Sequence, residues 1–169
     1  MKHNFTICFI ALFFLLISGC APRLPSDLPK LHPVRLVITQ DGTLLEGATV
    51  QLLPQDPESR WSAMGKTDSD GKVDFYTEGR YPGVPEGNYK VVVFKVFTEP
   101  SKYVGKERPA DIDYGTWDKM IANERRVSYH QVNPLYDSRQ TTPLELTVGP
   151  KQEKDRMIDV GKAINERIK

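Results

Sequence analysis

The sequence lacks the motifs on which common enzyme classes are built. It contains no Gly-x-Ser-x-Gly nucleophile elbow, no glycine-rich phosphate loop and no cysteine placed as a nucleophile. Of its three histidines, His32 and His130 lie beyond the N-terminal segment, and neither has a second histidine four residues away, a spacing typical of zinc sites. We expect both to be solvated or hydrogen-bonded. The sequence therefore predicts no enzyme activity, no cofactor and no metal.

The sequence also lacks an excess of charge of either sign. Among 169 residues there are 23 lysines and arginines against 22 aspartates and glutamates. A balanced chain has no electrostatic reason to bind nucleic acid or an acidic surface, and we expect no nucleic-acid partner. The length is sufficient for one folded domain.

The N-terminal residues are typical of a secretory signal. Lys2 precedes an apolar run from Ile7 to Ile17, and these eleven residues are too few to span a bilayer. The run ends in a segment that resembles the bacterial lipobox, Ile17-Ser18-Gly19-Cys20. In that motif a peptidase cuts before the cysteine, which then carries lipid. An ordinary signal peptide cut further along, or a retained short anchor, is the alternative.

The lipobox resemblance implies a signal peptide over residues 1–19 and attachment of fatty acid, such as palmitate, at Cys20. Cleavage would remove Cys8, and the lipid would occupy the remaining thiol, so no disulfide could form. Several acyl chains hold a protein in a membrane almost permanently, since each buried CH₂ contributes about 0.8 kcal/mol. We therefore expect a lipid-anchored protein of the cell envelope. Ala21 after the cysteine favours the outer membrane, if the host has one.

Residues 20–32 form a proline-rich tether, because proline denies the segment both helix and ladder hydrogen bonds. From residue 33 to 161, short alternating apolar runs stand between Gly, Asp and Pro, a pattern typical of an antiparallel β-sandwich. We expect Val34, Leu36 and Ile38 to form one buried face of a first strand. Ala48, Val50 and Leu52 are expected to share a face of a second.

Further strands follow the same pattern. We expect a strand from Trp61 to Thr67, joined as a hairpin through Asp68-Ser69-Asp70-Gly71 to the segment around Val73. The run from Tyr89 to Phe97 predicts a central strand that is covered on both sides, because both of its faces are apolar. Later strands are expected at residues 127–132, 144–148 and 157–160. The tail at 162–169 is ambiguous between a short helix and a frayed end.

Three turn and strand segments resemble those of carboxypeptidase-regulatory-like or transthyretin-like sandwich modules, namely Gly47-Ala48-Thr49-Val50, residues 67–71 and residues 87–91. Residues 133–137 and 141–144 also resemble the closing part of small lipoproteins that carry such modules. The resemblance implies a single Ig-like or transthyretin-like antiparallel β-sandwich. The transthyretin-like hydrolases that act on hydroxyisourate close with Tyr-Arg-Gly-Ser. That motif is absent here, so a hydrolase is only an alternative function.

Residues 98–131 interrupt the β pattern as an insertion. Trp117, Met120 and Ile121 recur at helical spacing after Thr116, a possible N-cap, and predict a short helix. Tyr114, Trp117 and Tyr129, together with Tyr103, are candidate ligand-binding residues, because loop aromatics stack on sugars or anchor protein partners. The favoured alternative is that Trp117, Met120 and Ile121 pin this helix onto the sandwich.

Asp68, Asp70 and Asp74 stand at positions 1, 3 and 7 around a glycine, which matches part of a calcium loop. An EF-hand loop needs more oxygen ligands and a terminal bidentate Glu, and we therefore favour a plain turn. Taken together, the sequence predicts a non-catalytic, lipid-anchored module for binding or envelope assembly. Its expected partners are the membrane, through the lipid, and an envelope protein or glycan. A carbohydrate-binding accessory protein is a second alternative.

Overall fold

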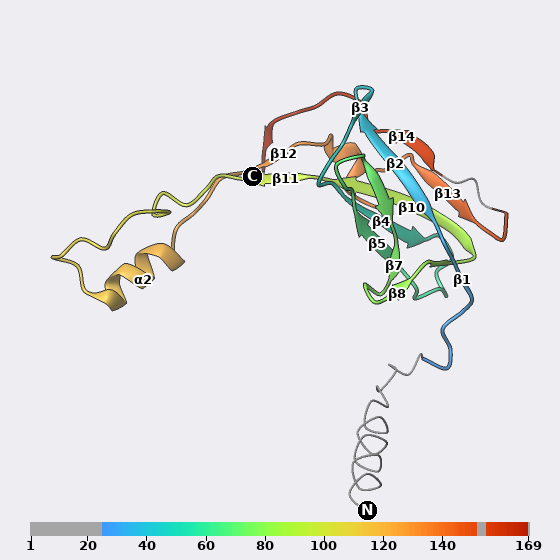
Figure 1. The fold of residues 1–169 in the computed structure, drawn as a ribbon, viewed down its shortest axis with the longest axis horizontal. Coiled ribbons are helices and arrows are strands. Elements are labelled where there is room, and N and C mark those ends of the chain that lie inside the picture. The colour runs from blue at the N-terminus through green and yellow to red at the C-terminus, as the bar shows by residue number, and fades with distance from the viewer. Residues whose placement is uncertain (1–24, 152–154, 169) are drawn as a thin grey trace, which may run out of the picture.

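The structure is a computed structural model that describes residues 25–151 and 155–168. Over these ranges the chain is mainly β-strand and forms an all-β, sandwich-like fold, which confirms the predicted fold class (Figure 1). No helix of the described ranges is long and apolar enough to cross a membrane. The predicted signal peptide, Cys20 and the first residues of the tether lie outside the described residues.

The larger sheet contains six antiparallel strands. In spatial order they are β13 (Glu145–Val148), β10 (Gly87–Phe94), β4 (Thr49–Pro54), β5 (Ala63–Lys66), β7 (Tyr76–Thr77) and β8 (Tyr81–Pro82). On β10, Lys90 pairs with Glu145 on one side and with Leu53 on the other. The prediction of a central strand after Asn88 is therefore confirmed.

The smaller sheet is organised around β2 (Arg35–Gln40). One edge of β2 pairs in parallel with β14 (Arg156–Asp159), and the antiparallel partners β3 (Thr43–Leu44) and β6 (Lys72–Asp74) complete the sheet. The prediction that residues near Met157 close the sheet is confirmed. The parallel pairing arises because β14 reaches β2 from the other sheet and not through a hairpin.

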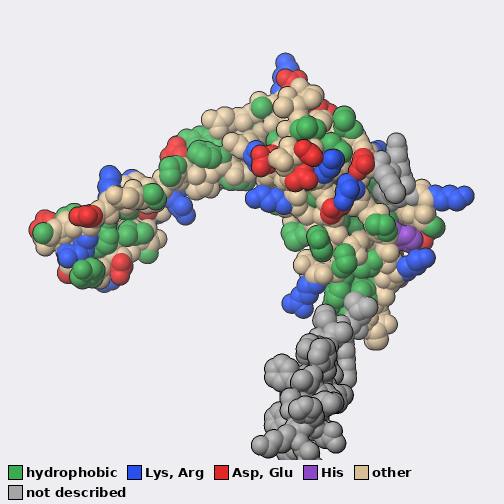
Figure 2. All heavy atoms as spheres, viewed as in Figure 1, with side chains coloured by type: hydrophobic (Ala, Val, Ile, Leu, Met, Phe, Trp, Pro, Cys, Tyr) green, Lys and Arg blue, Asp and Glu red, His purple; other side chains and the backbone are tan. Residues whose placement is uncertain are grey.

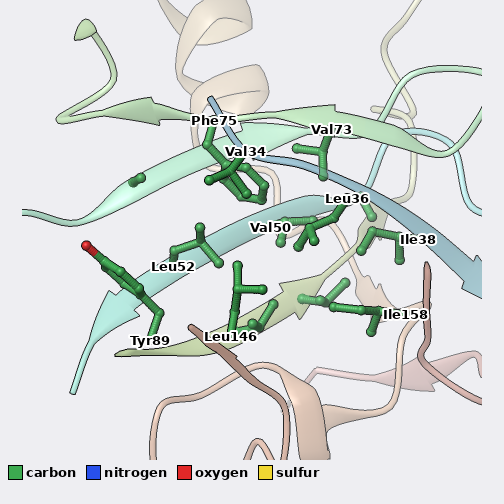
Figure 3. Packing of buried hydrophobic residues seen from close by; sticks show 14 of the residues in the cluster. Val34, Leu36, Ile38, Val50, Leu52, Val73, Phe75, Tyr89, Leu146 and Ile158 are labelled. Carbon is green, nitrogen blue, oxygen red and sulfur yellow. The ribbon is translucent and has the colours of Figure 1, made fainter. Parts of the chain in front are cut away.

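Apolar side chains from the two sheets meet in one core. Val50, Leu52 and Leu146 of the larger sheet face Leu36, Ile38, Val73 and Ile158 of the smaller one (Figure 3). Ala48, Val50 and Leu52 are all fully buried, as their period of two predicts. Tyr89 also lies in the core, where its hydroxyl donates a 2.9 Å hydrogen bond to Pro85 O. Burial raises the pKa of Tyr89 to about 12.

The strand β2, which is the first strand that the sequence predicts, is more deeply buried than expected. Val37 and Thr39, expected on its open face, are 8% and 3% exposed. The expectation of a single buried face was wrong, because β2 lies between strands on both of its edges and residues of both of its faces are buried. The Thr39 hydroxyl donates to Asp159 Oδ2 at 2.9 Å, as does Gly42 N. These bonds, led by the one from Gly42 N, lower the pKa of Asp159 below its usual value.

The segment Asp68–Gly71 forms the predicted turn but not the predicted hairpin. Asp68 Oδ1 accepts hydrogen bonds of 2.9 Å from the backbone N–H groups of Asp70 and Lys72. Beyond the turn, β6 pairs with β2 and not with β5, so the chain crosses here from one sheet to the other. The turn was predicted correctly because its residues are neighbours in the sequence. The partner of β6 was not, because β2 lies far away in the sequence.

The apolar run from Tyr89 also ends earlier than predicted. β10 stops at Phe94, and Val96 and Phe97 belong to a separate strand, β11 (Val96–Thr98), where they are 46% and 45% exposed. They are not covered as part of the central strand. The signal for this break was Lys95, which would fall on the same core-facing side as Val91 and Val93 if the strand continued.

The crossing between the sheets depends on close approach at Gly65. A Cβ atom at this position would lie 2.2 Å from Asp74 O and 2.5 Å from Val73 Cγ2. We expect Gly65→Ala to lower the free energy of unfolding by about 1–3 kcal/mol, because the strands must separate. Urea denaturation measures the change. Gly149→Ala is the matched control, since its Cβ would meet nothing within 4 Å, and an equal loss in both variants would contradict the packing account.

Candidate functional site

Residues 96–130, which we call the arm, extend away from the sandwich (Figure 1). The base of the arm is a three-stranded sheet in which β12 (Ser128–His130) lies between β11 and β15 (Glu166–Arg167). The C-terminal tail is thus neither a helix nor a frayed end in the described residues, because residues 166 and 167 pair with β12. The predicted strand at 127–132 is confirmed.

β11 pairs with β12 in a register that sets Phe97 opposite Tyr129. Two side-chain hydrogen bonds support this pairing. In the first, the hydroxyls of Thr98 and Ser128 lie 2.9 Å apart. The Tyr129 hydroxyl donates a 3.0 Å hydrogen bond to Glu99 Oε1, and this bond raises the pKa of Tyr129. The side chain of Tyr129 therefore helps to hold β11 and β12 together at the base of the arm.

The helix of the arm, α2 (Tyr114–Ala122), begins one turn earlier than predicted. Its N-cap is Asp113 and not Thr116. Asp113 accepts hydrogen bonds from Thr116 N at 3.0 Å and from the Thr116 hydroxyl at 2.6 Å. These bonds, chiefly the one from the hydroxyl, lower the pKa of the Asp113 carboxyl. An aspartate at this position is a stronger cap than threonine.

The end of the arm is held together by its own aromatic contacts. The rings of Tyr103 and Trp117 meet edge to face, with centroids 5.0 Å apart. The Arg108 guanidinium lies 4.2 Å from the ring centroid of Tyr114. Glu124 Oε1 accepts a 2.9 Å hydrogen bond from Lys102 N, which joins the end of the helix to the preceding loop. These contacts give the helix a local support.

The helix does not cover the sandwich. None of its residues is buried, and Tyr114, Met120 and Ile121 are 73%, 37% and 41% exposed. The favoured prediction that Trp117, Met120 and Ile121 pin it onto the sandwich is therefore wrong. Helical spacing showed that these residues share a side of the helix, but it carried no information on what that side contacts.

The three predicted binding residues do not form one site. Tyr114 and Trp117 share α2 at the far end of the arm, whereas Tyr129 belongs to β12 at the base (Figure 1). Figure 2 shows hydrophobic side chains at both places. Other exposed apolar residues of the arm, which were not predicted as binding residues, are Val96, Phe97, Val104, Met120 and Ile121.

A cavity of about 630 Å³ lies where the tether enters the domain. It is lined in part by His32 of β1 (Leu31–His32), which pairs with β9 (Val84–Pro85). His32 is only 8% exposed, so of the two expected states, solvated or hydrogen-bonded, the solvated one does not apply. Arg35 and Asp74 also line the cavity and form a two-bond ion pair with N–O distances of 2.8 and 2.9 Å. The guanidinium of Arg35 thus donates hydrogen bonds to both carboxylate oxygens of Asp74.

The acidic turn has structural partners for its carboxylates. Asp68 accepts the hydrogen bonds that close the turn. The Asp74 carboxylate accepts hydrogen bonds from Arg35, which lower the pKa of Asp74. The described residues contain no group of three His, Cys, Asp or Glu side chains that could hold a metal ion.

His130 Nδ1 lies 3.8 Å from Asp137 Oδ2, just after the 3₁₀ turn η1 (Pro134–Tyr136). This contact joins the base of the arm to the sandwich.

Comparison of the chain with family models, curated proteins and solved structures finds no match to any of them.

The separation of α2 from the sandwich predicts an unusual result for a tryptophan. We expect Trp117→Ala to change the free energy of unfolding of the sandwich by no more than about 0.5 kcal/mol, because Trp117 makes no contribution to its core. The arm itself should become more sensitive to protease, since the contact with Tyr103 is lost. Leu52→Ala, in the core, should instead remove about 2–5 kcal/mol. A comparable loss in Trp117→Ala would show that the helix packs on the sandwich.

Proposed function

We propose that the chain is a lipid-anchored, extracytoplasmic binding module without catalytic activity, and that α2 is its contact with an envelope protein. The observation that carries the proposal is the exposed apolar surface of α2 at the end of the arm. Tyr114 and Ile121 fall on one side of the helix and are 73% and 41% exposed. Aromatic and aliphatic groups of this kind are the usual anchors of protein interfaces.

The charge of the arm favours a protein partner over a membrane surface or a nucleic acid. Between residues 99 and 127 lysines and arginines equal aspartates and glutamates in number. A neutral surface attracts neither phosphate backbones nor anionic lipids strongly. An exposed tyrosine ring also suits a sugar, and a glycan partner is therefore the alternative that the experiment below has to separate.

The anchor part of the proposal is supported by the sequence alone, through the apolar run and the lipobox-like Ile17-Ser18-Gly19-Cys20. The domain would then belong with the carboxypeptidase-regulatory-like or transthyretin-like modules. The sandwich-like fold agrees with that assignment but is shared by many unrelated proteins. Delivery to the outer membrane, in a host that has one, is part of the same proposal.

Lipid attachment is tested by exchanging one thiol. We expect Cys20→Ser to abolish labelling with radioactive palmitate and to hold the protein less firmly in the membrane pellet, because Cys20 is the thiol that would carry the lipid. Cys8→Ser is the matched control and should keep both label and pellet, since residue 8 would be removed with the signal. Label that persists in Cys20→Ser would refute lipid attachment at this residue.

Partner binding is tested on the arm of the full chain. We expect the double variant Tyr114→Ala, Ile121→Ala to reduce capture of the envelope partner at least tenfold, as the loss of two interface anchors implies. Capture is measured by cross-linking in intact envelopes, followed by mass spectrometry. The melting temperature should stay constant, because neither side chain is buried.

Met157→Ala is the control, because Met157 is a 66% exposed apolar residue on β14 of the sandwich. It should leave capture unchanged. Equal capture by all three proteins would place the contact elsewhere, and capture that survives protease but not glycosidase treatment of the envelope would favour the glycan. Turnover in a substrate panel that is lost in His130→Ala would contradict the non-catalytic part of the proposal.

A further inference from the structure

The second half of the tether is part of the folded domain. Its last two residues form β1, which pairs with β9, and His32 is buried there. Further back along the tether, Asp27 forms an ion pair with Arg60 of the loop before β5. The backbone N–H of Leu28 donates a 3.1 Å hydrogen bond to Pro25 O. The tether is therefore docked on the sandwich from the first residue that the structure describes.

Gly83, just before β9, allows this close approach of the tether. A Cβ atom at this position would lie 2.9 Å from His32 O and 3.1 Å from Leu31 Cβ. Gly83 is also held from the other side, because its N–H donates to Phe75 O at 2.8 Å and its carbonyl oxygen accepts a 2.7 Å bond from the Thr77 hydroxyl. A glycine at such a point leaves room for a second backbone. The sandwich thus binds the tether at a site that a side chain would block.

The connection between the proposed lipid and this docked segment is short. Cys20 lies five residues before Pro25, the first described residue. Five residues span at most about 18 Å, whatever their conformation, since a fully extended chain advances about 3.3–3.6 Å per residue. If Cys20 carries the lipid that we propose, Pro25 stays within this distance of the membrane surface.

The strands of the sandwich lead away from the docked tether. β10 begins at Gly87, directly after β9, and ends at Phe94, where the chain continues into the arm. Its eight residues advance about 25 Å. β2 also leads away, from Arg35 to Gln40, whose Nε2 donates a 2.8 Å hydrogen bond to Gln131 O beside the base of the arm. The base of the arm and the turn from β2 to β3 therefore lie at the end opposite the tether (Figure 1).

We propose that the end of the sandwich formed by β1, β8 and β9, which we call the entry end, faces the membrane surface, and that the arm leaves from the end that faces away. The connection of about 18 Å is shorter than the sandwich is along β10, so the domain cannot turn over and set its opposite end on the lipid. The orientation depends on the proposed lipid at Cys20, which holds the domain at a membrane but leaves open which face it presents.

The entry end needs no excess of positive charge for this role. Lys30, Arg80 and Glu86 are exposed there, so both signs of charge are present. The acyl chains of the proposed anchor would supply the attraction, since each buried CH₂ contributes about 0.8 kcal/mol. The docked tether would then determine which surface lies against the lipid headgroups.

Two fluorescent probes on the lipidated full chain test the orientation. Arg80→Cys places a thiol beside β8 at the entry end, and Thr43→Cys places one on β3 at the opposite end, where both native side chains are exposed. Each thiol is labelled with a donor dye, and the protein is floated with vesicles of phosphatidylethanolamine and phosphatidylglycerol that carry an acceptor dye on their headgroups. We expect energy transfer to remove more donor emission at residue 80 than at residue 43.

Equal transfer from the two residues would mean that the domain lies on its side, and stronger transfer from residue 43 would mean that it is inverted. Either result overturns the orientation. Flotation is scored separately. A chain that does not float refutes the lipid attachment and the orientation with it, whereas a chain that floats and shows equal transfer refutes the orientation alone.

A longer connection to the lipid provides a variant that leaves the sandwich untouched. Inserting about ten glycines and serines after Ala21 adds a flexible segment outside the described residues. We expect transfer from residue 80 to fall toward the value from residue 43, because the entry end is no longer held near the headgroups. The melting temperature should stay constant. Unchanged transfer would show that the short connection does not orient the domain.

The docking of the tether is tested by Gly83→Ala, with Gly105→Ala as the matched control. Both glycines have a positive φ, of 104° and 69°, but a Cβ atom at residue 105 would meet nothing within 4 Å. We expect only Gly83→Ala to lower the transfer from residue 80, because β1 is then displaced from the sandwich. A melting curve checks that each variant is folded. Equal effects of the two substitutions, or no effect of Gly83→Ala, would contradict the role of the docked tether.

Discussion

The contact between the apolar faces of two sheets is the constraint on which the rest of this structure depends. Leu36, Ile38 and Val73 on one sheet are fully buried against Val50, Leu52 and Val91 on the other. At about 25 cal/mol per Å² of apolar surface, such a layer is the main source of stability in a small domain without disulfides. The main strands of both sheets therefore place their alternating apolar residues in this layer.

That requirement explains the irregular features of the sandwich. The chain crosses between sheets at Asp68–Gly71, so that Val73 reaches the core from the smaller sheet while Ala63, just before the crossing, reaches it from the larger one. Gly65 permits the close approach at this crossing. β14 joins β2 in parallel and brings Ile158 and Val160 into the same layer. Local irregularity is the means by which one core stays continuous.

The arm lies outside this layer and has its own small set of contacts. A cap at Asp113, one edge-to-face aromatic pair and one cation–π contact support α2. Segments with few buried contacts open at low free energy, and they are where binding surfaces are commonly found. The protein interface that we propose, the exposed side of α2, lies at the far end of this segment. The sandwich would serve as its base.

Much of the fold could be predicted from the sequence, because it depends on interactions between neighbouring residues. The strands around Val50, Val91 and Leu146, the turn at Asp68 and the presence of a helix near Trp117 were all predicted correctly, because alternation, turn residues and helical spacing act over a few neighbours. Only the tertiary structure decided that β6 pairs with β2, that Trp117 does not touch the sandwich, and that Tyr129 lies apart from Tyr114. Strand partners, and the surfaces that helices contact, are set by residues distant in the chain, which no local pattern encodes.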